Sequence, residues 1–139
     1  MPELERVHTI FNYYDGPREG IADMDGKPHV YKCQFSEADD DWTDLFWLME
    51  IDQALFGLAK EEYEIFRRWR AEFDSGEVAL DSGPALPADR SRFAELKAAI
   101  GNRLDVVQGR TITKRAHFSF DGSTTDPTLA AWLVEWTAV

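Results

Sequence analysis

A run of acidic residues beside a tryptophan is the first place where this sequence offers chemistry. Asp39, Asp40 and Asp41 are consecutive, Trp42 follows them, and the surrounding segment 37–44 carries five carboxylates. Dense negative charge raises the association rate of a basic partner, and an exposed tryptophan is a frequent anchor in protein interfaces. We therefore predict a docking surface for a basic protein, such as a toxin or a nucleic-acid-binding protein. The alternative is a solubilising loop with the indole ring folded back onto a sheet.

A second candidate site is a polar turn beside a pair of tyrosines. Tyr14, Asp15 and Arg18 lie within five residues of one another, so a turn brings a phenol, a carboxylate and a guanidinium together. Such a set can orient a small molecule through a few polar contacts. The alternative is a structural turn that Asp15 orders and in which Arg18 pairs locally. A small-molecule-binding domain or enzyme with a pocket here is our second functional hypothesis.

The histidines and the single cysteine are candidates for metal binding or nucleophilic catalysis. His8, His29, His117 and Cys33 all lie in segments that we expect to be strands. His29 and Cys33 are four residues apart, about 13 Å in an extended strand, which is too far for one metal ion. We expect ordinary sheet residues, with Cys33 buried as a small apolar side chain. The prediction is therefore no catalytic residue, no metal and no cofactor, and a binding protein rather than an enzyme.

The composition argues against several classes of function. The chain has 139 residues with 15 basic and 26 acidic side chains, and its net charge of −11 repels nucleic acid and anionic lipid. No apolar run has the length of a membrane span, and the first residues lack the basic start and apolar stretch of a signal peptide. One cysteine cannot form an internal disulfide. We expect a cytoplasmic protein that binds neither nucleic acid nor membrane directly.

Alternating apolar residues and turn signals in the first third of the chain predict a β-meander, and one of its hairpins can be predicted with its register. Asp25-Gly26 supplies the two positive φ angles of a type I′ turn. Counting outward from this turn pairs Met24, Ala22, Gly20 and Glu19 with Lys27, His29, Tyr31 and Lys32, respectively. The same count places four side chains together on the core side of the sheet: His29, Tyr31, Cys33 and Phe35.

The centre of the chain predicts two helices. Apolar residues recur at three- and four-residue spacing over residues 53–74, and Asp52 is placed to cap the start of this helix. Glu64 is placed to pair with Arg68 one turn later. A second helix is expected over about residues 87–104, with an inner stripe of Phe93, Leu96, Ile100 and Leu104.

Three further segments flank these helices. Residues 45–49 form a short apolar run that fits either a fourth strand or the start of a helix, because its periodicity does not separate the two. Residues 111–120 alternate between apolar and polar side chains, which is typical of a strand. Residues 121–127 carry the residue types of a turn or loop.

The C-terminal segment also has two interpretations. Trp132, Val134 and Trp136 alternate, which favours a closing strand, although two helical turns that begin at Asp126-Pro127 also fit. If the C-terminal segment is a strand, the predicted elements together form a single α+β domain over residues 1–139. We expect an antiparallel sheet, made of the N-terminal meander and the C-terminal strands, that two helices cover on one face.

Four stretches spread over most of the chain carry a resemblance to other proteins. They read YYDGPREGIADMDGKPHVYKCQF, EIFRRW, PALPADR and VEWT. In these stretches the sequence resembles a family of small uncharacterised bacterial proteins. The resemblance implies a free-standing domain, and it assigns no activity, ligand or site residue to this chain.

Overall fold

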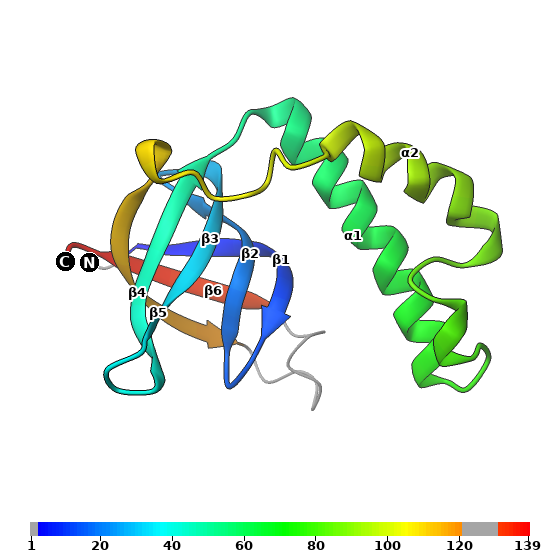
Figure 1. Cartoon of the computed structure of the whole chain (residues 1–139), viewed down its shortest axis with the longest axis horizontal. Coiled ribbons are helices and arrows are strands. Elements are labelled where there is room, and N and C mark those ends of the chain that lie inside the picture. Colours follow the sequence, from blue (N-terminus) through cyan, green and yellow to red (C-terminus); the bar gives the residue numbers. More distant parts are fainter. Residues whose placement is uncertain (1–2, 121–130) are drawn as a thin grey trace. The chain divides into compact units, whose positions relative to one another are not determined.

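Six antiparallel strands close into a β-barrel in the computed structural model, which describes residues 3–120 and 131–139 (Figure 1). Neighbouring strands in the barrel follow the order of the chain. The last strand pairs with both the fifth and the first, and this closes the sheet. The strands are β1 (Leu4–Tyr13), β2 (Pro17–Met24), β3 (Lys27–Ser36), β4 (Asp41–Glu50), β5 (Ile112–Phe120) and β6 (Trp132–Thr137).

The expected α+β class with an antiparallel sheet is confirmed, but the expected open sheet is wrong. In a closed barrel the inward-facing side chains of opposite strands meet and bury one another. Tyr31 of β3, Phe46 of β4 and Val134 of β6 belong to one such cluster, and each is at most 2% exposed. The inner face of the sheet is thus covered by side chains of the barrel's own strands.

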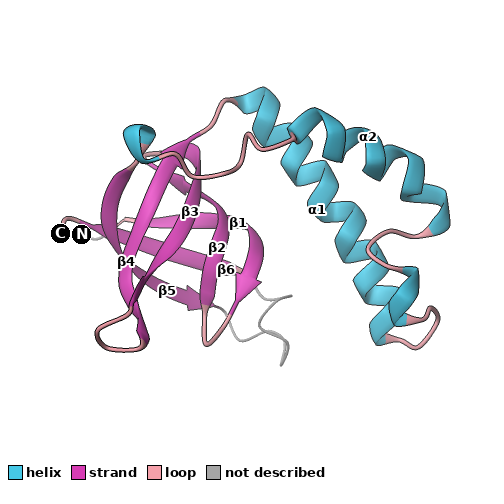
Figure 2. Ribbon diagram, viewed as in Figure 1, coloured by secondary structure: helices cyan, strands magenta, loops and turns pink. Residues whose placement is uncertain are grey.

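The chain divides into two compact units. Residues 1–51 and 105–139 form the barrel unit, and residues 52–104, between β4 and β5, form the helical unit. The second unit holds the helices α1 (Gln53–Asp74) and α2 (Arg90–Ile100), which are drawn in cyan in Figure 2. The expectation of a single domain stays a prediction.

Helix α1 has the predicted bounds, whereas α2 is shorter than predicted. The Asp52 carboxylate caps α1 by accepting a hydrogen bond from the Leu55 amide at 2.7 Å. Residues 87–89 form a 3-10 turn before α2, and Gly101, with a φ of 53°, ends it. Because the last residue of a helix is often followed by one in the left-handed region, glycine is well suited to this position.

Side chains of both helices build the helical unit. Ile65, Leu96 and Ala85 form its buried core. The Arg92 guanidinium of α2 donates to the Glu61 carboxylate of α1 at 2.6 and 2.8 Å, which lowers the pKa of Glu61 below its ordinary value.

The predicted pairing of Arg68 with Glu64 is wrong. Arg68 donates instead to both carboxylate oxygens of Asp89 at 3.1 Å, the bidentate geometry that suits a guanidinium best. These hydrogen-bonded pairs and the core join α1 to the segment that holds α2.

The β2–β3 hairpin has the predicted turn and register. Asp25 and Gly26 have φ angles of 55° and 74°, as a type I′ turn requires. One prediction on β3 is wrong, because Phe35 is not buried in the core with Tyr31 and Cys33. The register of β3 against β4 shifts between Cys33 and Phe35, where β4 has extra residues, and the Phe35 side chain is 46% exposed.

The two ambiguous segments are strands. Residues 45–49 lie within β4, and the C-terminal segment forms β6 with Trp132 and Val134 buried. The acidic segment 37–44 was expected to be a loop, but β4 begins at Asp41 because Ser36 and Phe35 pair with Asp41 and Trp42. The turn predicted at residues 121–127, and the alternative helix start at Asp126, lie outside the described residues.

Candidate functional site

A pocket of about 720 Å³ opens at one end of the barrel. This end carries the β1–β2 turn, the β3–β4 turn and the last residues of β5, so the described lining comes from five strands. Its volume lies within the range of about 300 to 1,000 Å³ that is usual for small-molecule sites. We call this feature the end pocket.

Six of the residues that line the end pocket are aromatic. They are Tyr13, Trp42, Phe46, Phe118, Phe120 and Trp132. Several of these rings touch: Phe120 and Trp132 have centroids 4.7 Å apart, and Phe46 and Phe118 meet edge to face at 5.4 Å. Because Phe46 is only 2% exposed, it belongs to the floor of the pocket. Rings that are packed against one another give a rigid apolar surface for a ligand.

Arg18 brings a positive charge into the end pocket. Its Nε donates to the Tyr14 carbonyl at 2.7 Å, and its Nη2 donates to the Asp15 carbonyl at 3.2 Å. The guanidinium carbon lies 5.5 Å from the centroid of the Trp42 ring, a cation–π contact. The β1–β2 turn therefore holds Arg18 in one orientation, with Trp42 as its support.

The two candidate segments of the sequence thus meet at the end pocket. Arg18 and Asp15 of the polar turn line it together with Trp42 from the acidic segment. Tyr14 contributes its carbonyl, while its side chain is 66% exposed and is not part of the lining. Arg18 was predicted to pair locally, and in the structure its local partners are the backbone carbonyls of Tyr14 and Asp15.

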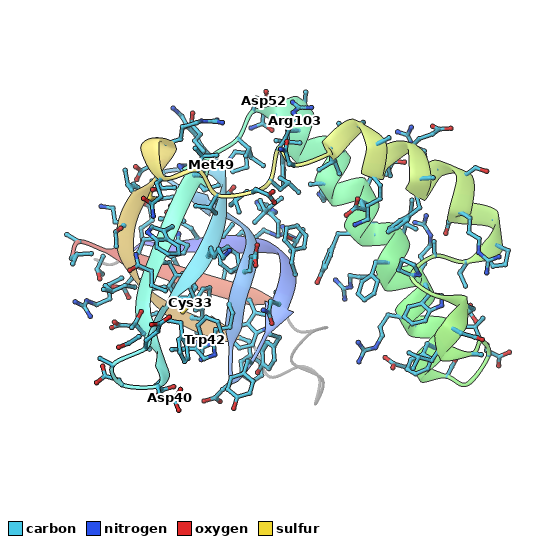
Figure 3. All side chains as sticks on the ribbon, in the orientation of Figure 1. Cys33, Asp40, Trp42, Met49, Asp52 and Arg103 are labelled. Carbon is cyan, nitrogen blue, oxygen red and sulfur yellow. The ribbon has the colours of Figure 1, made fainter. Side chains whose placement is uncertain are left out.

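Asp39 and Asp40 on the β3–β4 turn, and Asp41 at the start of β4, lie outside the lining of the pocket. Figure 3 shows Asp40 at the tip of this turn, with Trp42 closer to the strands. The Ser36 hydroxyl donates to the Asp39 carboxylate at 3.1 Å, and the Asp41 carboxylate accepts from the Trp42 amide at 2.8 Å. Both carboxylates therefore help to order the turn, and all three aspartates are exposed.

Trp42 is a half-buried ring rather than a free anchor. It meets Phe35 edge to face at 5.2 Å, and it packs against the buried cluster inside the barrel. The interpretation in which the ring folds back onto the sheet is the one that the structure favours. The position of the ring makes Trp42 a wall of the end pocket.

Most of the pocket walls were not among the residues predicted from the sequence. Phe46, Phe118 and Trp132 come from β4, β5 and β6, and Asp44 lies at the rim, where the Arg115 guanidinium binds its two carboxylate oxygens at 2.7 and 2.8 Å. Strand alternation already placed Phe118 and Trp132 on one face of their segments. That these faces meet the polar turn follows only from the closure of the barrel.

Cys33 lies behind Arg18 in the barrel wall. Its side chain is 3% exposed, its Sγ donates to the Thr43 carbonyl at 3.1 Å, and Arg18 Nη1 approaches Sγ at 3.7 Å. Burial raises the pKa of the Cys33 thiol, although the neighbouring guanidinium opposes part of this effect. The predicted burial of Cys33 is confirmed.

We expect the Cys33 thiol to be nearly unreactive in the folded protein. A raised pKa leaves less thiolate at a given pH, and burial blocks access to the sulfur. Alkylation by iodoacetamide at mildly alkaline pH should be slower by on the order of 100-fold than in concentrated guanidinium chloride. Mass spectrometry of timed samples measures both rates, and equal rates would contradict the buried position of Cys33.

His8 and His29 take part in separate local contacts, and the His117 side chain is exposed. His8 lies 3.0 Å from an Asp23 oxygen, and His29 Nδ1 lies 2.8 Å from the Lys27 carbonyl oxygen. Within residues 3–120 and 131–139, no three histidine, cysteine or acidic side chains are grouped closely enough to hold a metal ion. Among the helices that the structure describes, none is both long and apolar enough to span a membrane.

Comparisons with protein-family models, with curated proteins and with solved structures find no match to this chain. The resemblance to a family of small bacterial proteins therefore stays a prediction. The function of the chain is inferred below from the shape and the chemistry of the end pocket.

Proposed function

We propose that the barrel unit binds a small organic molecule in the end pocket. The observation that carries this proposal is the position of Arg18, which the β1–β2 turn holds over the Trp42 ring inside an aromatic pocket of about 720 Å³. Small-molecule sites combine an apolar, aromatic lining with a few placed polar groups. The end pocket has this composition.

Binding is better supported than catalysis. Nucleophilic catalysis by a hydroxyl group needs a base within hydrogen-bond reach, most often a histidine or a lysine. The described lining includes the hydroxyls of Thr43 and Ser119 but no histidine, lysine or cysteine. Asp15 belongs to an exposed turn, and Arg115 occupies the carboxylate of Asp44.

The docking surface for a basic protein has weaker support than the end pocket. It was predicted at Asp39, Asp40 and Asp41 with Trp42 as its anchor. The Trp42 ring is instead engaged by Arg18 and Phe35, which leaves exposed carboxylates without an aromatic centre. Exposed charges of one sign also serve solubility alone.

A variant that fills the end pocket tests the proposal. Ala116 lines the pocket, so Ala116→Leu is expected to reduce its volume, while Ala94→Leu makes the same change on the exposed surface of α2. We expect some members of a panel of metabolite-sized aromatic compounds to raise the Tm of the wild-type protein. A compound present at ten times its Kd adds about 1.4 kcal/mol, which corresponds to a shift of roughly 5 °C.

The two variants should respond differently to the same compounds. The shift should persist in Ala94→Leu and disappear in Ala116→Leu, because only the latter loses space for the ligand. A panel without any stabilising compound, or an equal shift in the filled variant, would count against the end pocket as a binding site.

A further inference from the structure

The geometry of Arg18 points to the class of ligand: we infer that the end pocket binds an aromatic monocarboxylate, with its carboxylate on Arg18 and its ring among the aromatic walls. This inference rests on the proposed function. It goes further by assigning the charge and the shape of the ligand. Three features of the pocket carry it: the free donors of Arg18, the absence of a counter-ion among the described residues, and the aromatic surface next to Arg18.

The first feature is the pair of donors that Arg18 keeps free. A guanidinium has five N–H donors, one on Nε and two on each Nη. The described contacts use one on Nε for Tyr14, one on Nη2 for Asp15 and one on Nη1 for Cys33. One N–H therefore remains on each Nη atom. Two neighbouring donors of this kind match the two oxygens of a carboxylate in a bidentate pair.

The fixed position of Arg18 favours such a pair further. Two carbonyls of the β1–β2 turn and the Trp42 ring hold the guanidinium, so ligand binding does not have to order a free side chain. A group that is already oriented loses less conformational entropy on binding. The turn and Trp42 thus act as positioning elements for the anion site.

The second feature is the charge around Arg18. Within the described part of the chain, no carboxylate lies within 4 Å of its guanidinium, since Arg18 belongs to none of the ion pairs there. Asp15 and Asp44 line the same pocket. The Asp15 carboxylate is exposed on the turn and forms no ion pair with Arg18, and Arg115 binds Asp44 at 2.7 Å. A cationic ligand would lie next to an unneutralised positive charge, whereas an anionic group would neutralise it.

The net charge of the barrel unit limits how much negative charge the ligand can carry. Residues 1–51 and 105–139 contain 7 basic and 16 acidic side chains. This surplus repels anions at long range, and the repulsion grows with the charge of the ligand. A carboxylate with one negative charge and two oxygens fits the two free donors, while a phosphate dianion would be repelled more strongly and would leave oxygens without donors.

The third feature is the aromatic surface that continues from Arg18. Trp42, Phe118 and Trp132 line the same pocket, and Trp132 meets Phe118 edge to face at 6.5 Å. Aromatic pairs prefer offset or edge-to-face contacts, so a planar ring finds favourable neighbours on more than one side. The volume of about 720 Å³ has room for a ligand with two fused rings.

Three probes of equal shape and different charge test the inference. They are 2-naphthoate, the neutral 2-naphthamide and the cationic 2-naphthylmethylamine, and isothermal titration calorimetry measures the Kd of each. We expect the wild-type protein to bind the naphthoate about 10- to 100-fold more tightly than the amide. The neutral amide cannot form a charged hydrogen-bonded pair with Arg18, and the loss of such a pair has an effect of this size. High salt should reduce this preference because it screens the charges.

Arg18 variants assign the preference to this residue. In Arg18→Gln the naphthoate and the amide should bind with nearly equal affinity, while Arg6→Gln, which makes the same change at an exposed arginine outside the pocket lining, should retain the preference. Arg18→Lys keeps the positive charge and loses the two parallel donors, so an intermediate preference is expected. A thermal melt of each variant verifies that it folds. If Arg18→Gln does not fold, the preference of Arg18→Lys for the naphthoate over the amide tests the role of Arg18.

The possible failures separate the two proposals. If the amide or the amine binds the wild-type protein as tightly as the naphthoate, or if Arg18→Lys and Arg18→Gln keep the full preference, the carboxylate inference is wrong while the end pocket stands. If none of the three probes binds, and no aromatic compound of the panel raises the Tm, both the inference and the proposed function are wrong.

Discussion

Gly20→Ala is expected to destabilise the barrel by about 3 kcal/mol, at the upper end of the usual cost of an overpacked site. Gly20 lies in β2, where an added Cβ would overlap the Thr9 carbonyl of β1 and would lie 2.6 Å from the Tyr31 hydroxyl. That hydroxyl donates to the same carbonyl at 3.0 Å. Because one of the atoms is backbone, a side-chain rotation cannot relieve the contact. Urea denaturation followed by circular dichroism measures the loss.

Gly57→Ala is the matched control for Gly20→Ala. Gly57 is exposed within α1, and an added Cβ there meets nothing within 4 Å. Alanine has the higher helix propensity, so this variant should gain up to about 1 kcal/mol. Opposite signs for the same substitution would show that close approach of strands, rather than the loss of glycine itself, sets the cost. A Gly20→Ala variant as stable as the wild type would contradict the packing of β1 on β2.

Phe46→Ala is expected to destabilise the barrel by about 3 to 5 kcal/mol. The ring of Phe46 lies 6.0 Å from Tyr31, 5.4 Å from Phe118 and 6.0 Å from Trp136, all centroid to centroid. Its removal leaves a void between rings from β3, β5 and β6. The surrounding strands form a closed sheet, so they have little freedom to move inward and fill the space.

Phe35→Ala makes the same change at an exposed position and serves as the control. Phe35 is 46% exposed, and it lies where the register of β3 against β4 shifts. Its removal should cost about 1 kcal/mol, because less apolar surface is returned to water and no void is formed. The free energies of unfolding of both variants can be compared in the same denaturant. Equal losses would show that Phe46 is not part of a closed aromatic core.

Local structure was predictable wherever neighbouring residues decide it. The Asp25-Gly26 turn requires two positive φ angles and therefore defines the register of β2 and β3. The first helix follows from the spacing of apolar residues and from the Asp52 cap, and both of its bounds were predicted. These features depend on contacts within a few residues of the chain.

Predictions became wrong where a non-local contact decided the outcome. Arg68 was expected to bind Glu64 one turn away, but Asp89 offers both carboxylate oxygens from a segment 21 residues farther along the chain. Phe35 was assigned to the core by simple alternation, but the register of β3 against β4 shifts next to it and its side chain is 46% exposed. In both cases the deciding partner lies on another element.

The features of the candidate site also divide into those that neighbouring residues decide and those that non-local contacts decide. The sequence by itself determined the chemical groups: the polar turn with Arg18 and Asp15, the tryptophan beside the acidic run, and the apolar alternation of the last two strands. Only the tertiary structure decided that Arg18 lies over Trp42 and that both share a pocket with Phe118 and Trp132. The physical reason is the pairing of β1 with β6, the first and last strands, which closes the barrel and which no local pattern of residues encodes.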